Sequence, residues 1–433
     1  MKVLQSASMK NTPMKSLVQT SYSNPSGYFA KFKHYKISAI ILSLACLPMV
    51  GFGDTTWTGA VSQNWNNAAN WNNGLPGAGN GATFVNTATG NYPILTNDAP
   101  TGQDIRIGAS ANGRLDQTNG VLSTGNGNWF FLGYSAHQAT YNLADTTTTG
   151  GTFTGFGRGS GSLYVGGVAT PTGNLLLGLD NSTVSTMSVN TTGTVAAGYL
   201  CVGGTGANNG TFNLDNGTVN ISGNAQIGGD QYGQNAGNNQ LNMSGGVFTA
   251  NGITLSRGDN NASVMKGAAK ITGGTLNSKT WFTLGFAGSA TAFAGVTNSG
   301  GTINVNISGT GNMEMTVYDP MSAYFEQNSG ALNLCNNAYI SFGNGGNNSG
   351  VVTFTQNGGT VTFYSDTNTT VGGTGYLKLG TGADTGTYAY NLVGGILTVP
   401  NIQRSASGGS GTFNFNGGTL KPTASTTTFM QGL

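Results

Sequence analysis

One ten-residue segment recurs along most of the chain. At residues 411–420 it reads Gly-Thr-Phe-Asn-Phe-Asn-Gly-Gly-Thr-Leu, and the second glycine of its pair, Gly418, can be taken as position zero. The residue at minus five is usually apolar, and the residue at plus two is apolar in every copy. The intervals from Gly217 to Gly359 are 29, 28, 27, 29 and 29 residues. A fixed period of this length predicts a repeat architecture. The aligned glycines are Gly120, Gly151, Gly217, Gly246, Gly274, Gly301, Gly330, Gly359, Gly395 and Gly418.

Each repeat also carries a second short apolar segment upstream of its glycine pair. This segment itself ends in glycine, as at residues 175–178, 201–203, 283–285, 341–343 and 377–380. Each unit therefore reads as three short strands separated by a glycine corner, a variable loop and the glycine-pair corner. Over the 66 residues between Gly151 and Gly217 the pattern blurs, and we expect a degenerate unit around Gly193.

Two sheet arrangements fit glycine pairs between apolar segments. Gly-Gly and Asn-Gly are strong hairpin signals, so an antiparallel sheet is one alternative. We favour parallel strands because the unit length is nearly constant and because the alternation slips across each pair: Phe212 and Leu214 are in phase, and then Val219 and Ile221. A corner glycine at positive φ produces this slip without reversing the chain. The sequence predicts an all-β, right-handed parallel β-helix of about eleven coils.

Charged residues make up only 7% of the chain and are unevenly placed. Residues 1–53 hold six lysines and no acidic residue, which leaves 10 of the 16 basic residues beside all 14 acidic residues in 54–433. The larger part is thus near a net charge of −4. It offers no basic stripe for nucleic acid, so we expect no nucleic-acid partner.

Residues 1–53 resemble a secretory signal peptide. A basic cluster at 31–36 precedes the apolar run 37–50, and small residues follow at 51–53. The run is shorter than the roughly 20 residues of a membrane span, so we expect cleavage after Gly53 and no membrane span in the mature chain. An uncleaved anchor and a lipoprotein cut at Cys46 are the alternatives.

Residues 54–104 contain Trp57, Trp65 and Trp71 but lack the repeat frame. We interpret this segment as an N-terminal cap that closes the first coil, since a solenoid needs its open edge covered. The alternative is an exposed platform of tryptophans for stacking sugars. Residues 105–433 are the predicted repeat domain. Its cysteines, Cys201 and Cys335, lie four repeats apart, too far for a disulfide, and are predicted to be free thiols.

The opening Trp57-x-Gly59, the later Asn70-Trp71 and Gly74-x-Pro76, and the Phe-Asn-x-x-Gly-Gly-x-Leu repeats together resemble the autotransporter-associated β-strand repeat proteins. The likeness covers nearly all of residues 54–433. It implies a secreted or surface β-helical protein of a Gram-negative environmental bacterium. Members of that family usually continue into further repeats and then a PEP-CTERM sorting tail or an outer-membrane barrel. Because this chain stops at residues 428–433 without one, we expect it to be truncated at its C-terminus, with end-to-end self-association of its open coils.

Parallel β-helices can host polysaccharide lyases and hydrolases, whose sites need converging carboxylates. A set of aspartates follows the second-strand corner in different coils, and stacking could align them into a calcium-binding column, although aspartate is also a common turn residue. The set is Asp180, Asp230, Asp259 and Asp319. We commit to no catalytic, cofactor or metal residue on this pattern.

The remaining candidates are single residues. Glu314 and Glu326 are the only glutamates, and His137 has no readable triad partner. The tripeptide Arg257-Gly258-Asp259 matches an integrin motif, which we attribute to chance in a glycine-rich chain. Polar loops at 203–210, 228–239 and 343–350 suit either polysaccharide binding or simple corner turning. We therefore expect a secreted or cell-surface, adhesin-like, non-catalytic solenoid that binds polysaccharide or extracellular matrix. A β-helical polysaccharide lyase or hydrolase and a glycan-binding module are the alternatives.

Overall fold

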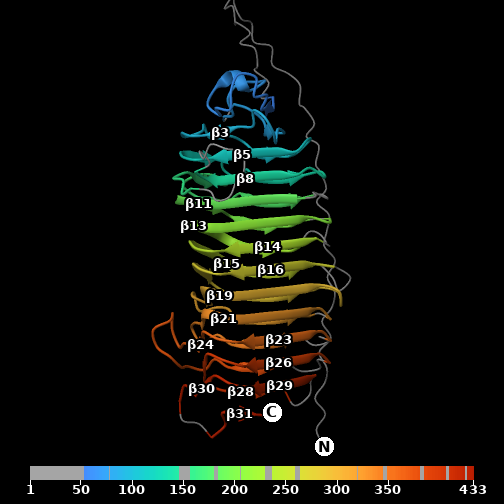
Figure 1. The fold of residues 1–433 in the computed structure, drawn as a ribbon, viewed down its shortest axis with the longest axis vertical. Coiled ribbons are helices and arrows are strands. Elements are labelled where there is room, and N and C mark those ends of the chain that lie inside the picture. Colours follow the sequence, from blue (N-terminus) through green and yellow to red (C-terminus); the bar gives the residue numbers. More distant parts are fainter. Residues whose placement is uncertain are drawn as a thin grey trace, which may run out of the picture. The chain divides into compact units, whose positions relative to one another are not determined.

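The computed structural model describes residues 53–77, 79–145, 157–179, 184–204, 206–229, 237–258, 264–318, 320–344, 349–380, 385–405, 409–424 and 427–433. Apart from Gly53, the predicted signal peptide lies outside these residues. The chain from Gly51 onward forms one compact unit. This unit is a parallel β-solenoid of about 12 turns (Figure 1), which confirms the predicted all-β β-helix of about eleven coils.

The solenoid has three faces, each a ladder of parallel strands from successive coils. Face 1 holds the strand that precedes each glycine pair, and its minus-five residues stack in one buried column from Leu115 to Tyr390. Its strands are β3 (Ile94–Leu95), β5 (Gly113–Gln117), β8 (Ala139–Ala144), the start of β11 (Val184–Ala197), the start of β13 (Asn209–Ile227), β14 (Asn238–Met243), β16 (Lys266–Ile271), the start of β19 (Phe293–Val305), the start of β21 (Ser322–Leu334), β23 (Val351–Gln356), β26 (Thr387–Leu392) and β29 (Ser410–Phe415).

Face 2 holds the strand that follows each glycine pair. Its plus-two residues form a second buried column from Leu122 to Leu397. Its strands are β6 (Val121–Ser123), β9 (Ser162–Tyr164), the end of β11, the middle of β13, the start of β15 (Val247–Arg257), β17 (Thr275–Ser278), the ends of β19 and β21, β24 (Thr360–Phe363), β27 (Ile396–Val399) and β30 (Thr419–Pro422).

Face 3 holds the second apolar segment of each repeat. Its strands are β1 (Thr55–Thr56), β2 (Thr83–Val85), β4 (Ile105–Ile107), β7 (Phe130–Tyr134), β10 (Asn174–Leu179), β12 (Tyr199–Val202), the ends of β13 and β15, β18 (Phe282–Phe286), β20 (Met313–Val317), β22 (Ile340–Asn344), β25 (Leu377–Leu379), β28 (Ile402–Arg404) and β31 (Met430–Gln431). The inward residues of the three faces form one continuous apolar core.

Every ladder between the described strands is parallel, so the antiparallel alternative is wrong. The slip in alternation has the predicted cause. Phe212, Leu214, Val219 and Ile221 are all buried, and Gly217 between them has a φ of 106°. Glycine tolerates this backbone conformation, so the chain turns the corner and keeps the apolar side chains of both strands in the core.

The blurred region contains a regular coil with one insertion. Val189 of β11 pairs with Leu214 and Thr194 pairs with Thr218, so this coil has one more residue at its corner than the next coil. The predicted degenerate unit around Gly193 therefore exists. Its frame is hidden from the sequence because the extra residue shifts the minus-five position.

The alignment of Gly151 as a corner is wrong. Leu163, two residues after Gly161, pairs with the plus-two residue of the preceding coil, which makes Gly161 the corner. The minus-five side chain of the same coil is the buried Tyr141. Residues 146–156, which include Gly151, lie outside the described residues. A glycine pair alone does not identify a corner, because the position also depends on which residues pair with the neighbouring coil.

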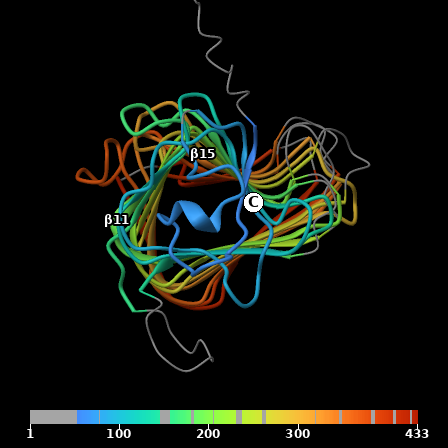
Figure 2. The same ribbon diagram turned by 90° about the horizontal axis from the view of Figure 1, so that it is seen from above.

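The three tryptophans of residues 54–104 are buried against one another. The ring of Trp71 lies 5.0 Å from that of Trp57 and 4.8 Å from that of Trp65, both edge-on. The Nε1 atom of Trp71 donates to the carbonyl of Trp65 at 2.8 Å. The short 3-10 helix η1 (Ala68–Asn70) lies over the end of the coil interior when the solenoid is viewed along its axis (Figure 2). Because the rings are buried, the alternative of an exposed sugar platform at these tryptophans is wrong.

Both cysteines are free and buried, as predicted. Cys201 points outward from face 3 into a small second cluster with Phe131 and Leu176. Cys335 immediately follows β21 and is fully buried. At the last coil, Phe413 and Leu420 are only partly buried, although their column partners one coil earlier are fully buried. In the described part of the chain, no helix has the length and apolar character needed to cross a membrane.

Candidate functional site

The predicted aspartate column falls on residues that the structure does not describe. Asp180, Asp230, Asp259 and Asp319 all lie outside the described ranges, so a calcium site there stays a hypothesis. Among the described residues, no three His, Cys, Asp or Glu side chains come together in a way that could hold a metal ion.

The two glutamates lie on different faces. Glu326 points outward from face 1, where the Nδ2 atom of Asn357 donates to its carboxylate at 3.3 Å. Glu314 belongs to β20 on face 3. Because separate faces hold them, they do not form an acid–base pair. His137 lies in the turn between β7 and β8, where its backbone N–H donates to the carbonyl of Tyr134 at 3.3 Å.

The described parts of the polar loops 203–210 and 228–239 contain two asparagines that serve the fold. Asn208 and Asn239 are buried. The Nδ2 atom of Asn208 donates to the carbonyl of Gly178, and the Oδ1 atom of Asn239 accepts from the backbone N–H of Gly210. These bonds join successive coils, so the two asparagines turn corners instead of forming a binding surface.

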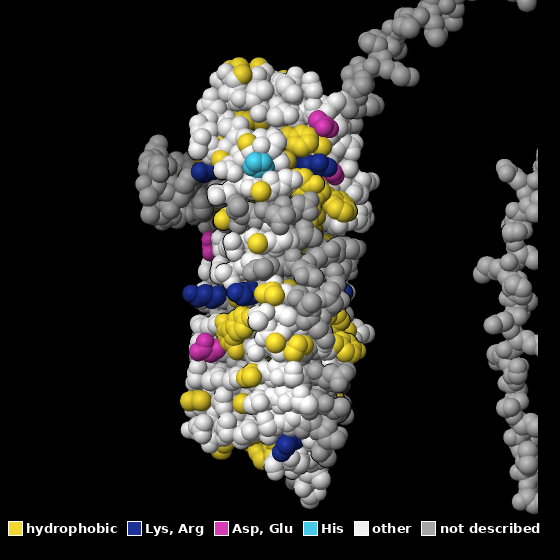
Figure 3. All heavy atoms as spheres, turned by 90° about the vertical axis from the view of Figure 1, so that its right-hand side faces the viewer, with side chains coloured by type: hydrophobic (Ala, Val, Ile, Leu, Met, Phe, Trp, Pro, Cys, Tyr) yellow, Lys and Arg dark blue, Asp and Glu magenta, His cyan; other side chains and the backbone are white. Residues whose placement is uncertain are grey.

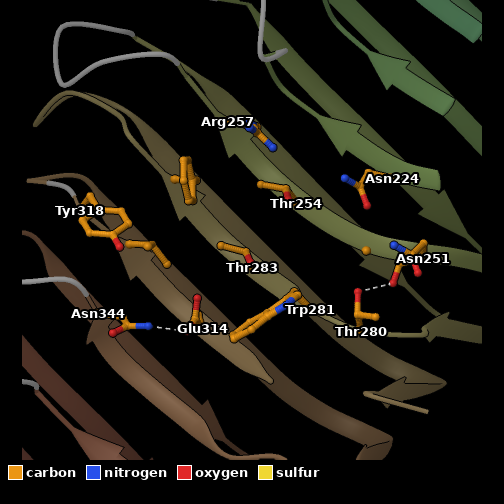
Figure 4. Close-up of a pocket in the computed structure, with 13 residues that line it drawn as sticks. Asn224, Asn251, Thr254, Arg257, Thr280, Trp281, Thr283, Glu314, Tyr318 and Asn344 are labelled. Carbon is orange, nitrogen blue, oxygen red and sulfur yellow. Dashed lines mark hydrogen bonds between the residues drawn. The ribbon is translucent and has the colours of Figure 1, made fainter. Parts of the chain in front are cut away.

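The structure instead reveals a groove on the outer side of face 3, which we call the Trp281 groove. It has a volume of about 480 Å³ and crosses successive coils from β13 to β22 (Figure 4). Amide and hydroxyl side chains, three aromatic rings and two ionisable groups line it. The lining residues are Asn224, Asn251, Gly252, Thr254, Arg257, Thr280, Trp281, Thr283, Phe286, Glu314, Val317, Tyr318 and Asn344.

The floor of this groove is formed by side chains that point outward from face 3, because side chains alternate between the two sides of a strand. Thr254 pairs with Thr283 and Thr283 pairs with Glu314, so their side chains lie one above the other on three successive coils. Their neighbours on either side, such as Ile253 and Leu255, point into the core and are fully buried. Successive side chains in the row are about 4.8 Å apart, the spacing of adjacent strands.

Aromatic rings stand on both sides of this row. Trp281 immediately precedes β18 and is 40% exposed, and its carbonyl accepts the N–H of Ile253 at 2.9 Å. Tyr318 immediately follows β20 and is 55% exposed, with its ring 6.0 Å from that of Phe286. Figure 4 shows Glu314 between Trp281 and Tyr318. The groove thus offers apolar ring faces at its edges and hydrogen-bonding groups along its floor.

Arg257 is the cation of the groove. Its guanidinium carbon lies 5.1 Å from the ring centre of Phe286. Its Nε atom is buried and has no hydrogen-bond partner. The ion pairs found among the described residues join Arg106 to Asp104 and Arg114 to Asp116, and neither includes Arg257.

Glu314 is the only carboxyl group among the described lining residues. It is 6% exposed and accepts hydrogen bonds from the Nδ2 atom of Asn344 and, at 3.5 Å, from the hydroxyl of Tyr339. Burial raises the pKa of Glu314 above its usual value, and the two hydrogen bonds oppose that rise only in part. Burial likewise raises the pKa of Tyr339 to about 12, so this hydroxyl stays protonated and able to donate.

We expect the free energy of unfolding of Glu314→Gln to rise relative to that of the wild type as the pH increases from 4 to 7. A carboxyl whose pKa is raised by folding binds its proton more tightly in the folded state. The wild type therefore loses stability as pH rises from the usual pKa of 4.5 through the raised value, and the amide does not. Urea denaturation at pH 4 and pH 7 would measure this, with the half-buried Glu326→Gln on face 1 as the control. Parallel pH dependences for the wild type and Glu314→Gln would contradict the prediction.

Sequence reasoning missed the groove, although one signal was present. An aromatic residue immediately precedes the face-3 strand, or begins it, in several coils. These residues are Trp129, Tyr199, Trp281, Tyr339 and Tyr376. The rings of Tyr339 and Tyr376 stack at 5.0 Å with an interplanar angle of 5°. Aligning the second apolar segments, instead of the glycine pairs alone, would have shown this column.

Charged side chains are sparse on one side of the solenoid. Figure 3 shows one side of the solenoid with few Lys, Arg, Asp or Glu side chains among neutral ones.

A comparison of the chain with protein-family models, with curated proteins and with solved structures finds no match.

Proposed function

We propose that this chain is a non-catalytic, adhesin-like β-solenoid of the cell surface or the extracellular medium that binds polysaccharide in the Trp281 groove. The observation that carries the proposal is the exposure of Trp281 and Tyr318 on either side of the row formed by Thr254, Thr283 and Glu314, in a groove that amide side chains also line. Aromatic faces pack against the C–H faces of sugar rings, and hydroxyl and amide groups pair with sugar hydroxyls. A groove open along stacked coils suits an extended chain ligand.

The groove favours binding over hydrolysis. A glycosidase needs two carboxyl groups about 5–9.5 Å apart on either side of the scissile bond. Among the described lining residues only Glu314 has a carboxyl group, and its burial leaves it weakly exposed to a substrate. The β-helical lyase or hydrolase is the second candidate, favoured by the presence of an arginine and a protonatable acid in one groove.

Secretion, surface location and a Gram-negative source are part of the proposal. They are supported by the pattern of residues 1–53 and by the resemblance of residues 54–433 to autotransporter-associated repeat proteins. Extracellular matrix is a further partner class in the proposal.

Trp281→Ala is expected to weaken polysaccharide binding by about three- to tenfold, the value of one aromatic contact, while leaving the fold intact. The measurement is retention on a glycan array followed by calorimetry with the polysaccharides retained. Trp129→Ala is the matched control, because Trp129 is also 40% exposed and also precedes a face-3 strand, but lies outside the groove.

Two outcomes would overturn this proposal. Failure of the wild type to retain any polysaccharide would remove the binding function. Release of shortened or unsaturated sugars from a retained polysaccharide, lost in Glu314→Gln, would favour the enzyme instead.

A further inference from the structure

Three described arginines lie over aromatic rings, and two of them have a carboxylate partner. Arg106 lies 5.2 Å from the ring centre of Phe131 and pairs with Asp104 at 3.3 Å. Arg114 lies 4.3 Å from the ring centre of Tyr92 and pairs with Asp116 at 2.8 Å. The solenoid thus repeatedly combines ring, guanidinium and carboxylate on its outer surface.

Arg257 has the ring but, among the described residues, no carboxylate. Its guanidinium lies over Phe286 as Arg106 lies over Phe131, at nearly the same distance, yet it takes part in no ion pair found there. Its Nε atom is also buried without a hydrogen-bond partner. The Nε atom of Arg106 is buried and unpaired as well, so what distinguishes Arg257 among the described residues is the missing carboxylate. A guanidinium over a ring and without a carboxylate partner can bind a planar anion through two parallel hydrogen bonds.

We propose that the ligand of the Trp281 groove is an acidic polysaccharide, and that Arg257 binds its anionic substituent, a uronate carboxylate or a sulfate ester. This inference rests on the proposed binding function and adds the charge of the ligand. Arg257 faces the groove from the end of β15, one coil before Trp281. If the anionic substituent of one sugar binds Arg257, the next sugars of the chain can lie over Thr283 and contact the aromatic rings at the sides of the groove.

The protonation state of Glu314 affects how tightly the groove binds an anionic ligand. The groups that contact its carboxyl are Asn344 and Tyr339, and the groove also holds Tyr318 and, two coils away, Arg257. Lys378, on the same outward row, is also two coils away, on the other side of Ser341. An ionised Glu314 would repel an anionic chain, whereas burial favours its neutral form. Binding should therefore strengthen as the pH falls through the raised pKa of Glu314, while a sulfate ester stays ionised.

The test compares charged and neutral forms of the same polymers. Polygalacturonate is paired with its methyl ester, and dextran sulfate with dextran, so that the two arms distinguish carboxylate from sulfate. We expect the wild type to bind one acidic polymer at least about tenfold more tightly than its neutral form, and Arg257→Gln to lose that preference. Arg257→Lys should recover it only in part, because lysine cannot form the two parallel bonds of a guanidinium.

Lys270→Gln is the matched control. Lys270 is on face 1, so this change removes one positive charge from the solenoid without touching the groove. Equal losses in Lys270→Gln and Arg257→Gln would show general charge attraction and overturn the role of Arg257. Equal binding of acidic and neutral polymers by the wild type would overturn the inference while leaving the proposed function in place. Absence of binding to all four would overturn the inference, and absence of retention on the whole glycan array would overturn the proposed function as well.

The pH arm tests Glu314 separately. Tighter binding of dextran sulfate at pH 5 than at pH 7 by the wild type, with a flat profile for Glu314→Gln, is the expected result. The same pH profile in both proteins would remove Glu314 from the proposal.

Discussion

Replacement of Gly274 by alanine is expected to lower the free energy of unfolding by about 3–5 kcal/mol. Gly274 has a φ of 76°, and a Cβ atom there would lie 2.4 Å from the carbonyl oxygen of Gly245 and 2.6 Å from that of Gly246. Both atoms belong to the backbone of the preceding coil, where Gly246 also accepts the N–H of Thr275 at 2.9 Å. Relief of the clash requires the coils to separate at this corner and lengthens that hydrogen bond.

Gly127→Ala separates the two causes of this cost. Gly127 has a φ of 74°, but no atom lies within 4 Å of the Cβ that alanine would add. Gly127→Ala should therefore lower the free energy of unfolding only by the cost of alanine in a left-handed backbone conformation, about 1–2 kcal/mol. Guanidinium denaturation of both variants, followed by circular dichroism, makes the comparison. If the two losses are equal, close stacking of coils at the glycine corners does not explain the repeat.

Phe354→Ala is the second large effect, with an expected loss of about 3–5 kcal/mol. Phe354 is fully buried in the minus-five column. Its ring stacks on Phe325 at 4.6 Å and on Tyr390 at 4.7 Å, with interplanar angles of 5° and 9°. Alanine leaves a cavity between two rings that the hydrogen-bonded coils hold at a nearly fixed separation, so the site cannot collapse to fill it.

The same column provides controls for this prediction. Phe413 stacks on Tyr390 at 5.5 Å on one side only and is partly buried, so Phe413→Ala should cost clearly less than Phe354→Ala. Phe354→Leu preserves most of the volume and should cost less than about 1.5 kcal/mol. Denaturant titrations of the three variants test this order. A loss for Phe413→Ala as large as that for Phe354→Ala would show that the ring stack does not set the cost.

Much of the fold could be predicted because the repeat records it directly. The minus-five and plus-two positions, read from spacing alone, become two buried columns, and the slip at Gly217 predicts a corner instead of a hairpin. The failures share one cause. At Gly151 a local match to the pattern misplaced the corner, and at Gly193 a single extra residue hid it. Spacing within a segment does not reveal which residues of the neighbouring coil it pairs with.

The groove was much less accessible to sequence reasoning. Arg257, Trp281 and Glu314 come from successive coils of face 3 and are far apart in the sequence, with different residues before and after each. Each is an ordinary outward position when its own repeat is considered. Their common site appears only when β15, β18 and β20 are stacked in register.

The sequence by itself determined that this chain forms a parallel solenoid, which positions face inward, and where glycine corners are needed. These properties depend on local periodicity, since each coil buries its apolar residues in the same way as the next. Only the tertiary structure decided that Trp65 is buried instead of displayed, that Glu314 is nearly excluded from water, and that Arg257 meets no carboxylate among the described residues. Burial and charge pairing depend on neighbours in adjacent coils, and the register of those coils brings these neighbours together.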